Sequence, residues 1–355
     1  MKRILLAALL TACGTSTSGT SASGTPTTHA LSAEVAEGAQ LYARYCALCH
    51  GDEGQGYAAD NATRLAGQGF LRTASDDFLI TAIAQGRLDT AMGPYSRDHG
   101  GPLSGDQIEA IVALLRSWQE GPAIEVDTIA VSGDAERGAR IYTERCASCH
   151  GTLGEGGSAQ SLSASSFSST ASDGFLRYAI VHGREGTPMP AFEGVLEPQA
   201  IDDVVVFLRR FEENPGAVPG HLAPPSLATI PLMRHPEGPR PSFTLREGRF
   251  VSAVQVRDAL AQGARIILLD ARPTSDWLRR RLPGALPVPY YDSAPIERLP
   301  RDGTWIVAYC GCPHAASGVV VDALRAAGFE NTAVLDEGVY HWIDQGYPTE
   351  TGPIE

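Results

Sequence analysis

The chain has 355 residues, of which 43% are hydrophobic and 19% charged, and its formal net charge is −13. This composition is typical of folded globular domains rather than of disorder, and the length predicts two or three of them. The excess of negative charge excludes a nucleic-acid-binding protein of the usual basic kind, so no nucleic-acid partner is expected.

The amino terminus has the pattern of an export signal. Lys2 and Arg3 precede an apolar run at residues 4–10, which is too short for the roughly 20 residues that span a bilayer. The signal ends in Leu-Thr-Ala-Cys, which resembles a bacterial lipobox and implies that Cys13 is lipidated. An ordinary cleaved signal peptide is the alternative. The segment rich in glycine, serine and threonine that follows is expected to be a tether.

The lipobox resemblance implies an exported protein on the periplasmic side, with the lipid on Cys13 as its only membrane attachment. Gly14, where aspartate would favour the inner membrane, favours the outer membrane by the rule known for enteric bacteria. Residues 1–33 are expected to form no part of a folded domain.

An internal repeat predicts two copies of one helical domain. Each copy begins with a helical pattern that carries a tyrosine four residues before a Cys-x-x-Cys-His motif, and each closes with an amphipathic helical pattern. Ser104 and Asp106 are expected to start the closing helix of the first copy, as cap and first-turn acid. The matching segments are residues 36–51 and 135–151, residues 76–87 and 173–184, and residues 103–118 and 196–211.

The repeated Cys-x-x-Cys-His motif is the attachment signature of c-type haem. Two cysteines three residues apart on one helical turn can each form a thioether to the same porphyrin, and the adjacent histidine then faces the iron. A redox-active cysteine pair and half of a zinc site are the alternatives. The pair would need a βαβ context and the zinc site a second pair of ligands. Two copies in an exported chain therefore predict haem c.

A methionine follows each motif at a nearly equal distance. Met92 and Met189 each lie in a loop with proline beside them, which suits a rigid segment that presents a thioether to the iron. Methionine as the second axial ligand raises the reduction potential and suits electron transfer. Met233 lies in a linker, where packing or exposure is expected.

Over residues 34–214 both copies resemble the small class I cytochrome c domains. The resemblance implies a few helices around one covalently bound haem c in each copy, hence two haems, with one edge of each exposed. Tyr42 and Tyr142 are expected in the core, with a hydrogen bond to a haem propionate as the alternative. The implied thioether cysteines are Cys46, Cys49, Cys146 and Cys149, and the implied axial ligands are His50, His150, Met92 and Met189.

The carboxyl-terminal third of the chain has a different pattern. A proline-rich stretch without periodicity predicts an extended linker, after which short apolar runs alternate with helical patterns. Alternating strands and helices predict a mostly parallel sheet with helices on both faces. The expected strands are residues 265–272, 304–310 and 332–338, and the expected helices are residues 254–263 and 315–329.

This part resembles the rhodanese family, on residues 268–289, 305–329 and 335–348. In that family a cysteine ends a central strand, is surrounded by backbone N–H groups at a helix start, and carries a sulfane sulfur as a persulfide. Cys310 holds that position. Its loop lacks the usual arginine and is one residue longer than the common loop, which puts thiosulfate:cyanide transfer in doubt. The resemblance also implies a bracing ion pair of Asp270 and Arg272.

Cys312 has three interpretations. It is a resolving thiol that attacks a persulfide or sulfenate on Cys310, a ligand of a soft metal together with Cys310 and His314, or a bystander. His314 either supplies the positive charge that the missing arginine would give or only caps the loop.

We therefore expect two all-α cytochrome c domains followed by an α/β rhodanese-like domain. The expected function couples sulfur chemistry at Cys310 to haem electron transfer with redox partner proteins of a respiratory chain. A pure electron carrier with a non-catalytic binding module and a sulfurtransferase docked to a respiratory chain are the alternatives, so enzymatic activity stays open. The expected segments are a signal at 1–13, a tether at 14–33, cytochrome c domains at 34–121 and 134–214, linkers at 122–133 and 215–241, and the rhodanese-like domain at 242–355.

Overall fold

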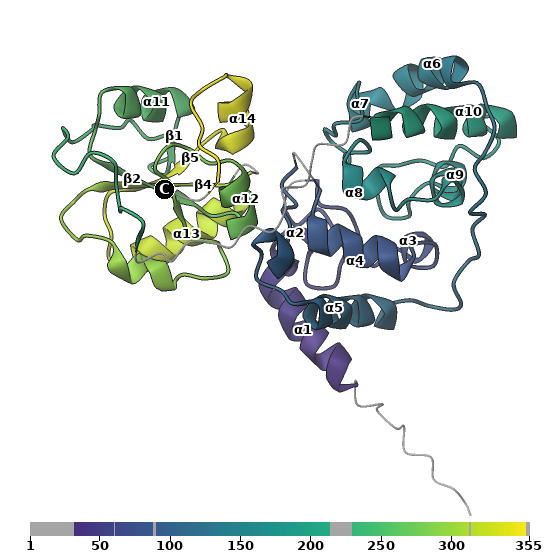
Figure 1. Cartoon of the computed structure of the whole chain (residues 1–355), viewed down its shortest axis with the longest axis horizontal. Coiled ribbons are helices and arrows are strands. Elements are labelled where there is room, and N and C mark those ends of the chain that lie inside the picture. Colours follow the sequence, from purple (N-terminus) through teal and green to yellow (C-terminus); the bar gives the residue numbers. More distant parts are fainter. Residues whose placement is uncertain (1–31, 60, 88–89, 214–228, 312–313, 353–355) are drawn as a thin grey trace, which may run out of the picture.

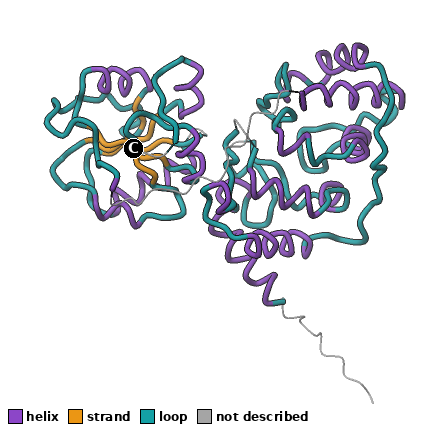
Figure 2. The backbone as a smooth tube through the Cα atoms, viewed as in Figure 1, coloured by secondary structure: helices purple, strands orange, loops and turns teal. Residues whose placement is uncertain are grey.

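The computed structural model describes residues 32–59, 61–87, 90–213, 229–311 and 314–352. It has a helical part and a part built on a sheet, which lie beside each other (Figures 1 and 2). Cys13 and Cys312 lie outside the described residues. Across the described ranges, every helix is too short or too polar to traverse a bilayer.

The longer helices of the first set form because serine side chains cap their starts and their apolar faces meet. Ser104 and Gln107 form a reciprocal capping box, so the expected cap is confirmed. Helix α1 lies against α5 at Gly38, where a Cβ atom would overlap the backbone of Ala110. The elements are α1 Ala33–Tyr45, α2 Ala47–His50, α3 Gln68–Leu71, α4 Asp76–Gln85, η1 Arg97–His99 and α5 Gly105–Ser117.

The second set repeats this arrangement, as the internal repeat predicts. Asp134 caps α6 by accepting hydrogen bonds from two backbone N–H groups. Gly138 allows α6 to approach α10 closely, as Gly38 does in the first set. The elements are α6 Ala135–Arg145, α7 Ala147–His150, α8 Ser165–Ser168, α9 Asp173–His182, α10 Pro198–Arg209 and η2 Arg210–Glu213.

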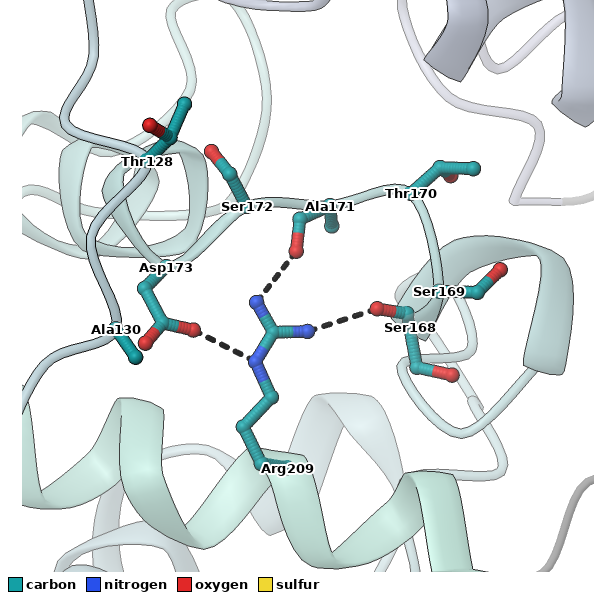
Figure 3. Close-up of a pocket in the computed structure, with 9 residues that line it drawn as sticks. All are labelled: Thr128, Ala130, Ser168, Ser169, Thr170, Ala171, Ser172, Asp173 and Arg209. Atoms are coloured by element: carbon teal, nitrogen blue, oxygen red, sulfur yellow. Dashed lines mark hydrogen bonds and ion pairs between the residues drawn. The ribbon is translucent and has the colours of Figure 1, made fainter.

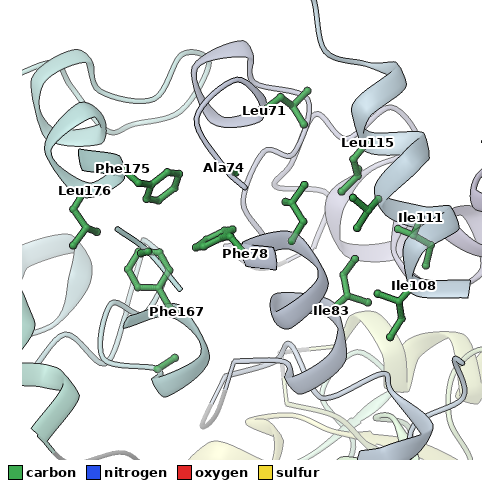
Figure 4. Close-up of a cluster of buried hydrophobic side chains, with 14 of the residues drawn as sticks. Leu71, Ala74, Phe78, Ile83, Ile108, Ile111, Leu115, Phe167, Phe175 and Leu176 are labelled. Atoms are coloured by element: carbon green, nitrogen blue, oxygen red, sulfur yellow. The ribbon is translucent and has the colours of Figure 1, made fainter. Parts of the chain in front are cut away.

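One apolar core joins the two sets (Figure 4). The ring of Phe78 lies 5.0 Å from that of Phe175 and 5.9 Å from that of Phe167, centroid to centroid. Because Phe78 belongs to α4 and the other two rings to the second set, the helices pack across the boundary of the repeat.

The sheet part contains five parallel strands in the order β1-β5-β4-β2-β3. Helices α12 and α13 pack on one face and α11 and α14 on the other, as the two apolar clusters of this part show. The sequence patterns miss β1 and β3, since two residues carry no periodicity. The strands are β1 Phe250–Val251, β2 Ile266–Asp270, β3 Leu286–Pro287, β4 Trp305–Tyr309 and β5 Thr332–Leu335, and the helices are α11 Ala253–Ala261, α12 Thr274–Arg279, η4 Ala294–Arg298, α13 Ala315–Ala326 and α14 Gly338–Asp344.

Candidate functional site

The first Cys-x-x-Cys-His motif forms a single helical turn after α1. The backbone N–H groups of Cys49 and His50 both donate to the Cys46 carbonyl, at 3.1 and 3.0 Å, so the two thiols lie one turn apart. The His50 Nδ1 atom lies 2.8 Å from the Thr63 carbonyl oxygen. Because a carbonyl can only accept, Nδ1 must carry the proton, and Nε2 keeps the lone pair that binds a metal.

The second motif repeats this geometry. The N–H groups of Cys149 and His150 donate to the Cys146 carbonyl at 3.1 and 3.0 Å, and His150 Nδ1 lies 2.9 Å from the Gln160 carbonyl oxygen. Burial lowers the pKa of both His50 and His150, which favours the neutral imidazole that ligates metals.

Tyr42 and Tyr142 support the two motifs from the core. Both side chains are buried, and their hydroxyls donate to the carbonyls of Gly51 and Gly151 at 2.8 and 2.7 Å. The expected core position is confirmed, and the hydroxyl proton of each tyrosine goes to the backbone directly after the motif.

The two methionine loops share one internal hydrogen-bond pattern. The Met92 N–H donates to Thr90 Oγ1 at 3.2 Å, and that hydroxyl donates to the Arg87 carbonyl at 2.7 Å. The second loop has the same two bonds from Met189 through Thr187, at 3.2 and 2.7 Å. The equivalence expected from the sequence is thus a structural equivalence.

Sequence reasoning missed two arginines that the repeat also places equivalently. The guanidinium of Arg87 lies between the rings of Phe78 and Phe167, at 5.1 and 5.4 Å, and that of Arg184 lies 4.7 Å from the ring of Phe175. Burial lowers the pKa of each arginine to about 10. Within the described ranges neither guanidinium forms an ion pair. Their repeated position after an apolar helix is the signal that could have identified them.

These side chains fit a haem. Paired thiols and a neutral imidazole nitrogen match covalent attachment and iron ligation, and a thioether sulfur follows on a loop. Two buried cations without a described carboxylate partner suit a group that brings propionate carboxylates of its own.

Cys310 directly follows the central strand β4. Its thiol is 1% exposed and its Sγ atom lies 3.2 Å from Ser317 Oγ, on α13. His314 precedes α13 with φ +85°, and its Nε2 atom lies 2.9 Å from the Asp336 carbonyl and 3.0 Å from Asp336 Oδ1. The histidine thus braces the loop against Asp336, the residue that follows β5. No cluster of metal-ligating side chains occurs in the part of the chain that the structure describes, and Cys312 lies outside it.

Asp270 and Arg272 form the expected brace. The Arg272 Nη2 atom lies 2.7 Å from Asp270 Oδ2, and both side chains are buried beneath the ring of Tyr309. The pair links the end of β2 to the strand that carries Cys310 and supports the fold.

The sheet part presents its Cys310 side to the first set of helices, where α12 and α13 lie toward α2 (Figure 1). Leu48, which stands between Cys46 and Cys49, packs against the apolar cluster that contains Cys310. The Tyr290 hydroxyl donates to the Tyr45 carbonyl at 2.5 Å. The first haem-type motif and the rhodanese-type cysteine therefore adjoin one apolar cluster.

The same interface includes the Met92 loop. Ser275 donates to the Pro94 carbonyl at 2.5 Å, and the Tyr340 hydroxyl donates to the Thr90 carbonyl. Sequence reasoning missed this interface. A comparison of the two copies could have indicated it, because Tyr45 and Leu48 of the first copy correspond to the polar Arg145 and Ser148 of the second.

A pocket of about 330 Å³ in the second set of helices is structural rather than part of these sites (Figure 3). Arg209 fills one side of it, bonding the carbonyls of Ser168 and Ala171 and the carboxylate of Asp173. Arg116 makes the corresponding bonds in the first set, to the Leu71 and Ala74 carbonyls and to Asp76. The shared pattern indicates an arginine that ties each closing helix to the turn before α4 or α9.

Comparisons with known proteins agree with this arrangement. Residues 33–115 and 133–208 match the family of cytochrome c oxidase, cbb3-type, subunit III, and residues 252–345 match the rhodanese-like domain family. The match to the cytochrome family implies covalently bound haem c in the helical part.

Two curated relatives match part of this chain. The cbb3-type cytochrome c oxidase subunit FixP of Bradyrhizobium diazoefficiens is 28% identical over 189 residues, which cover 49% of this chain and 59% of the relative. The thiosulfate dehydrogenase electron acceptor of Stutzerimonas stutzeri is 30% identical over 145 residues, covering 36% of this chain and 62% of the relative. The chain thus spans about three fifths of each relative.

Two solved structures match part of this chain. The reducing HAO-like protein complex of Kuenenia stuttgartiensis aligns with 49% of this chain and 95% of its own at 23% identity and a TM-score of 0.34. The rhodanese-like domain of an Anabaena protein aligns with 30% of this chain and 80% of its own at 28% identity and a TM-score of 0.27.

Proposed function

We propose that this chain, which joins cytochrome c domains to a carboxyl-terminal rhodanese-like domain, couples sulfur chemistry at Cys310 to electron transfer through two haems. The observation that carries the proposal is the shared apolar cluster. Leu48, between the two thiols of the first motif, packs against the cluster that holds Cys310. A sulfur compound bound at Cys310 would therefore lie beside a haem attachment site of the same chain.

Each copy of the repeat would hold one haem c, which supplies one-electron transfer when bound. The chain positions the neutral His50 and His150 imidazoles through carbonyl oxygens and presents each methionine on a hydrogen-bonded loop. The thioethers would form at Cys46, Cys49, Cys146 and Cys149, and the axial ligands would be His50, Met92, His150 and Met189.

At Cys310 the proposed step is transfer of a sulfane sulfur. The Cys310 thiolate attacks the outer sulfur of a persulfide or polysulfide, and a new S–S bond forms as the donor's S–S bond breaks. The electron pair of the broken bond leaves with the donor thiolate, so this step changes no net oxidation state. The α13 amino terminus and the Ser317 hydroxyl, 3.2 Å from the sulfur, stabilise the thiolate.

The haems would be reduced in a separate step, in which the thiols of Cys310 and Cys312 lose two electrons and two protons to form a disulfide and two ferric haems accept one electron each. Hydrosulfide would then reopen the disulfide, with the Cys312 thiolate as the leaving group and a Cys310 persulfide as the product.

The proposal includes the domain bounds and the location of the protein in the cell. We assign residues 34–121 and 134–214 to the cytochrome c domains and residues 242–355 to the rhodanese-like domain. Export to the periplasmic side and lipid attachment at Cys13, in the outer membrane, suit haem c and a respiratory redox partner. A relative named thiosulfate dehydrogenase electron acceptor supports a sulfur-compound donor upstream.

A second candidate is an electron carrier whose rhodanese-like domain only binds. It is favoured by the burial of Cys310, which is 1% exposed and covered on the side of the helices. A third candidate is a sulfurtransferase that its cytochrome c domains dock to a respiratory chain, in which sulfur transfer proceeds without haem reduction.

The test uses the full chain with its haems oxidised. Sulfide, polysulfide, thiosulfate and sulfite are added in turn, and haem reduction is followed by absorbance for the wild type and for Cys310→Ala. We expect reduction by at least one donor to slow about tenfold or more in Cys310→Ala. Reduction that is equally fast in both proteins, or absent with every donor, contradicts the coupling and leaves an electron carrier.

A second variant, Ser317→Ala, keeps the Cys310 thiol but removes the hydroxyl group beside it. If Cys310 acts as a thiolate, Ser317→Ala slows the reaction several-fold and shifts its pH profile toward higher pH. Loss of rate without a shift in the pH profile would assign Ser317 to packing alone.

A further inference from the structure

The two methionine loops differ in how their backbone is fixed. Met189 stands between Pro188 and Pro190, whose rings restrict the backbone on both sides. Met92 stands between Ala91 and Gly93, and glycine is the least restricted residue of all. The sequence beside Met92 therefore restricts the backbone less than the sequence beside Met189 does.

The rhodanese-like domain supports the first loop through hydrogen bonds on either side of Met92. On the amino-terminal side, the Tyr340 hydroxyl from α14 donates to the Thr90 carbonyl. On the carboxyl-terminal side, Ser275 from α12 donates to the Pro94 carbonyl at 2.5 Å. Both carbonyls lie within two residues of Met92, so the two bonds fix the backbone that carries the thioether.

Steric contacts add to these two hydrogen bonds, and we call the bonds and contacts together the clamp on the Met92 loop. A Cβ atom at Gly93 would overlap the carboxylate of Asp276, so α12 lies directly on the loop. A Cβ atom at Gly311 would lie 3.4 Å from the Ala91 Cα atom and 2.8 Å from the Tyr340 ring. Gly311 directly follows Cys310, which brings the cysteine loop into contact with the methionine loop.

Among the described residues, the rhodanese-like domain does not cover the loop of Met189, which contacts the first set of helices instead: the Gln68 N–H donates to the Glu185 carboxylate, and a Cβ atom at Gly186 would overlap the Arg64 guanidinium. Pro188, Pro190 and Ala191 are exposed, and across the described ranges this loop forms no hydrogen bond with the rhodanese-like domain. Both loops have the same internal bonds, so the clamp is a feature of the first loop alone.

We propose that Tyr340 and Ser275 are positioning residues that hold Met92 on the iron of the first haem. The inference rests on the proposed function, in which Met92 is an axial ligand. It extends that function, because the rhodanese-like domain then controls a property of the haem: how often the sixth coordination position opens.

Imidazole titration of the oxidised full chain tests the proposal. Imidazole binds a ferric haem only after the methionine leaves, so its apparent affinity is proportional to the fraction of released methionine. The red absorption band of methionine-ligated ferric haem reports each displacement. Met92→Ala and Met189→Ala assign the two steps of the titration to the two haems.

In Tyr340→Phe/Ser275→Ala we expect the affinity of the first haem for imidazole to rise about tenfold, as loss of two ordinary hydrogen bonds predicts. The second haem keeps its affinity. Tyr347→Phe is the matched control, because its hydroxyl accepts from Arg257 on α11, away from the interface, and both steps should stay unchanged.

The outcomes separate the inference from its premise. If Met92→Ala removes a band and the double variant titrates like the wild type, Met92 is a ligand and the clamp is wrong. An equal rise in imidazole affinity at both haems also contradicts the clamp, because it indicates that the double substitution loosens the whole protein. If Met92→Ala leaves the band unchanged, the ligand assignment fails and the inference with it.

Discussion

Helix α2 of the first repeat lies against the rhodanese-like domain, whereas among the described residues that domain does not cover α7 of the second repeat. Leu48 packs on the Cys310 cluster, but its counterpart Ser148 is exposed. Tyr45 is buried at the same interface, and its counterpart Arg145 is exposed. The motif residues are identical in type in both copies, so the haem chemistry constrains them equally. The residues between them diverged with their surroundings, and such divergence inside a repeat marks an interface.

The largest contrast is expected from placing a charge at these two positions. Leu48→Asp would bring a carboxylate to an apolar cluster and should lower the free energy of unfolding by about 3 kcal/mol. Ser148→Asp should change it by less than about 0.5 kcal/mol, since that side chain is exposed. Urea unfolding followed by circular dichroism measures both values. Equal values for the two variants would mean that α2 is no better covered than α7.

Part of this arrangement follows from sequence and part does not. The motif geometry is local, with bonds from Cys49 and His50 back to Cys46, so residue spacing alone predicts it. The strands β2, β4 and β5 are buried apolar runs that the sequence also reveals. The docking of the two parts depends on side chains that are distant in sequence, such as Tyr45 and Tyr290, and no periodicity encodes it.

A smaller effect is expected at the glycine of the first methionine loop. Gly93→Ala would force its Cβ atom against Asp276 and should cost about 1–3 kcal/mol, which thermal unfolding can detect. Gly105→Ala is the control, because its Cβ atom would meet nothing within 4 Å at the start of α5. That control should be neutral or slightly stabilising. A neutral result for Gly93→Ala would show that α12 yields to the added methyl group.

The smallest effect near neutral pH concerns the tyrosines of the interface. Burial raises the pKa of Tyr95 and Tyr290, whose hydroxyls lie 3.0 Å apart, above the unfolded value of about 10. Their contribution to stability is therefore complete below about pH 10 and is lost as the pH rises through the higher folded values. The counterpart of Tyr95 in the second repeat is Phe192, which cannot titrate.

Unfolding free energies between pH 9 and about 11.5 check this sign. The wild type should lose up to about 1.4 kcal/mol per pH unit for each such tyrosine above pH 10. Tyr95→Phe/Tyr290→Phe should have a shallower slope than the wild type. An unchanged slope would mean that the two hydroxyls ionise at the interface as readily as in the unfolded chain.

The phenylalanine core that the two copies share limits whether one copy can exist without the other. Phe78 of one copy touches Phe167 and Phe175 of the other, so deleting either copy would leave large aromatic rings in water. A single copy would expose a hydrophobic patch, which favours aggregation. The two copies therefore depend on each other for solubility, and a truncated chain with one copy would need polar residues in place of these rings.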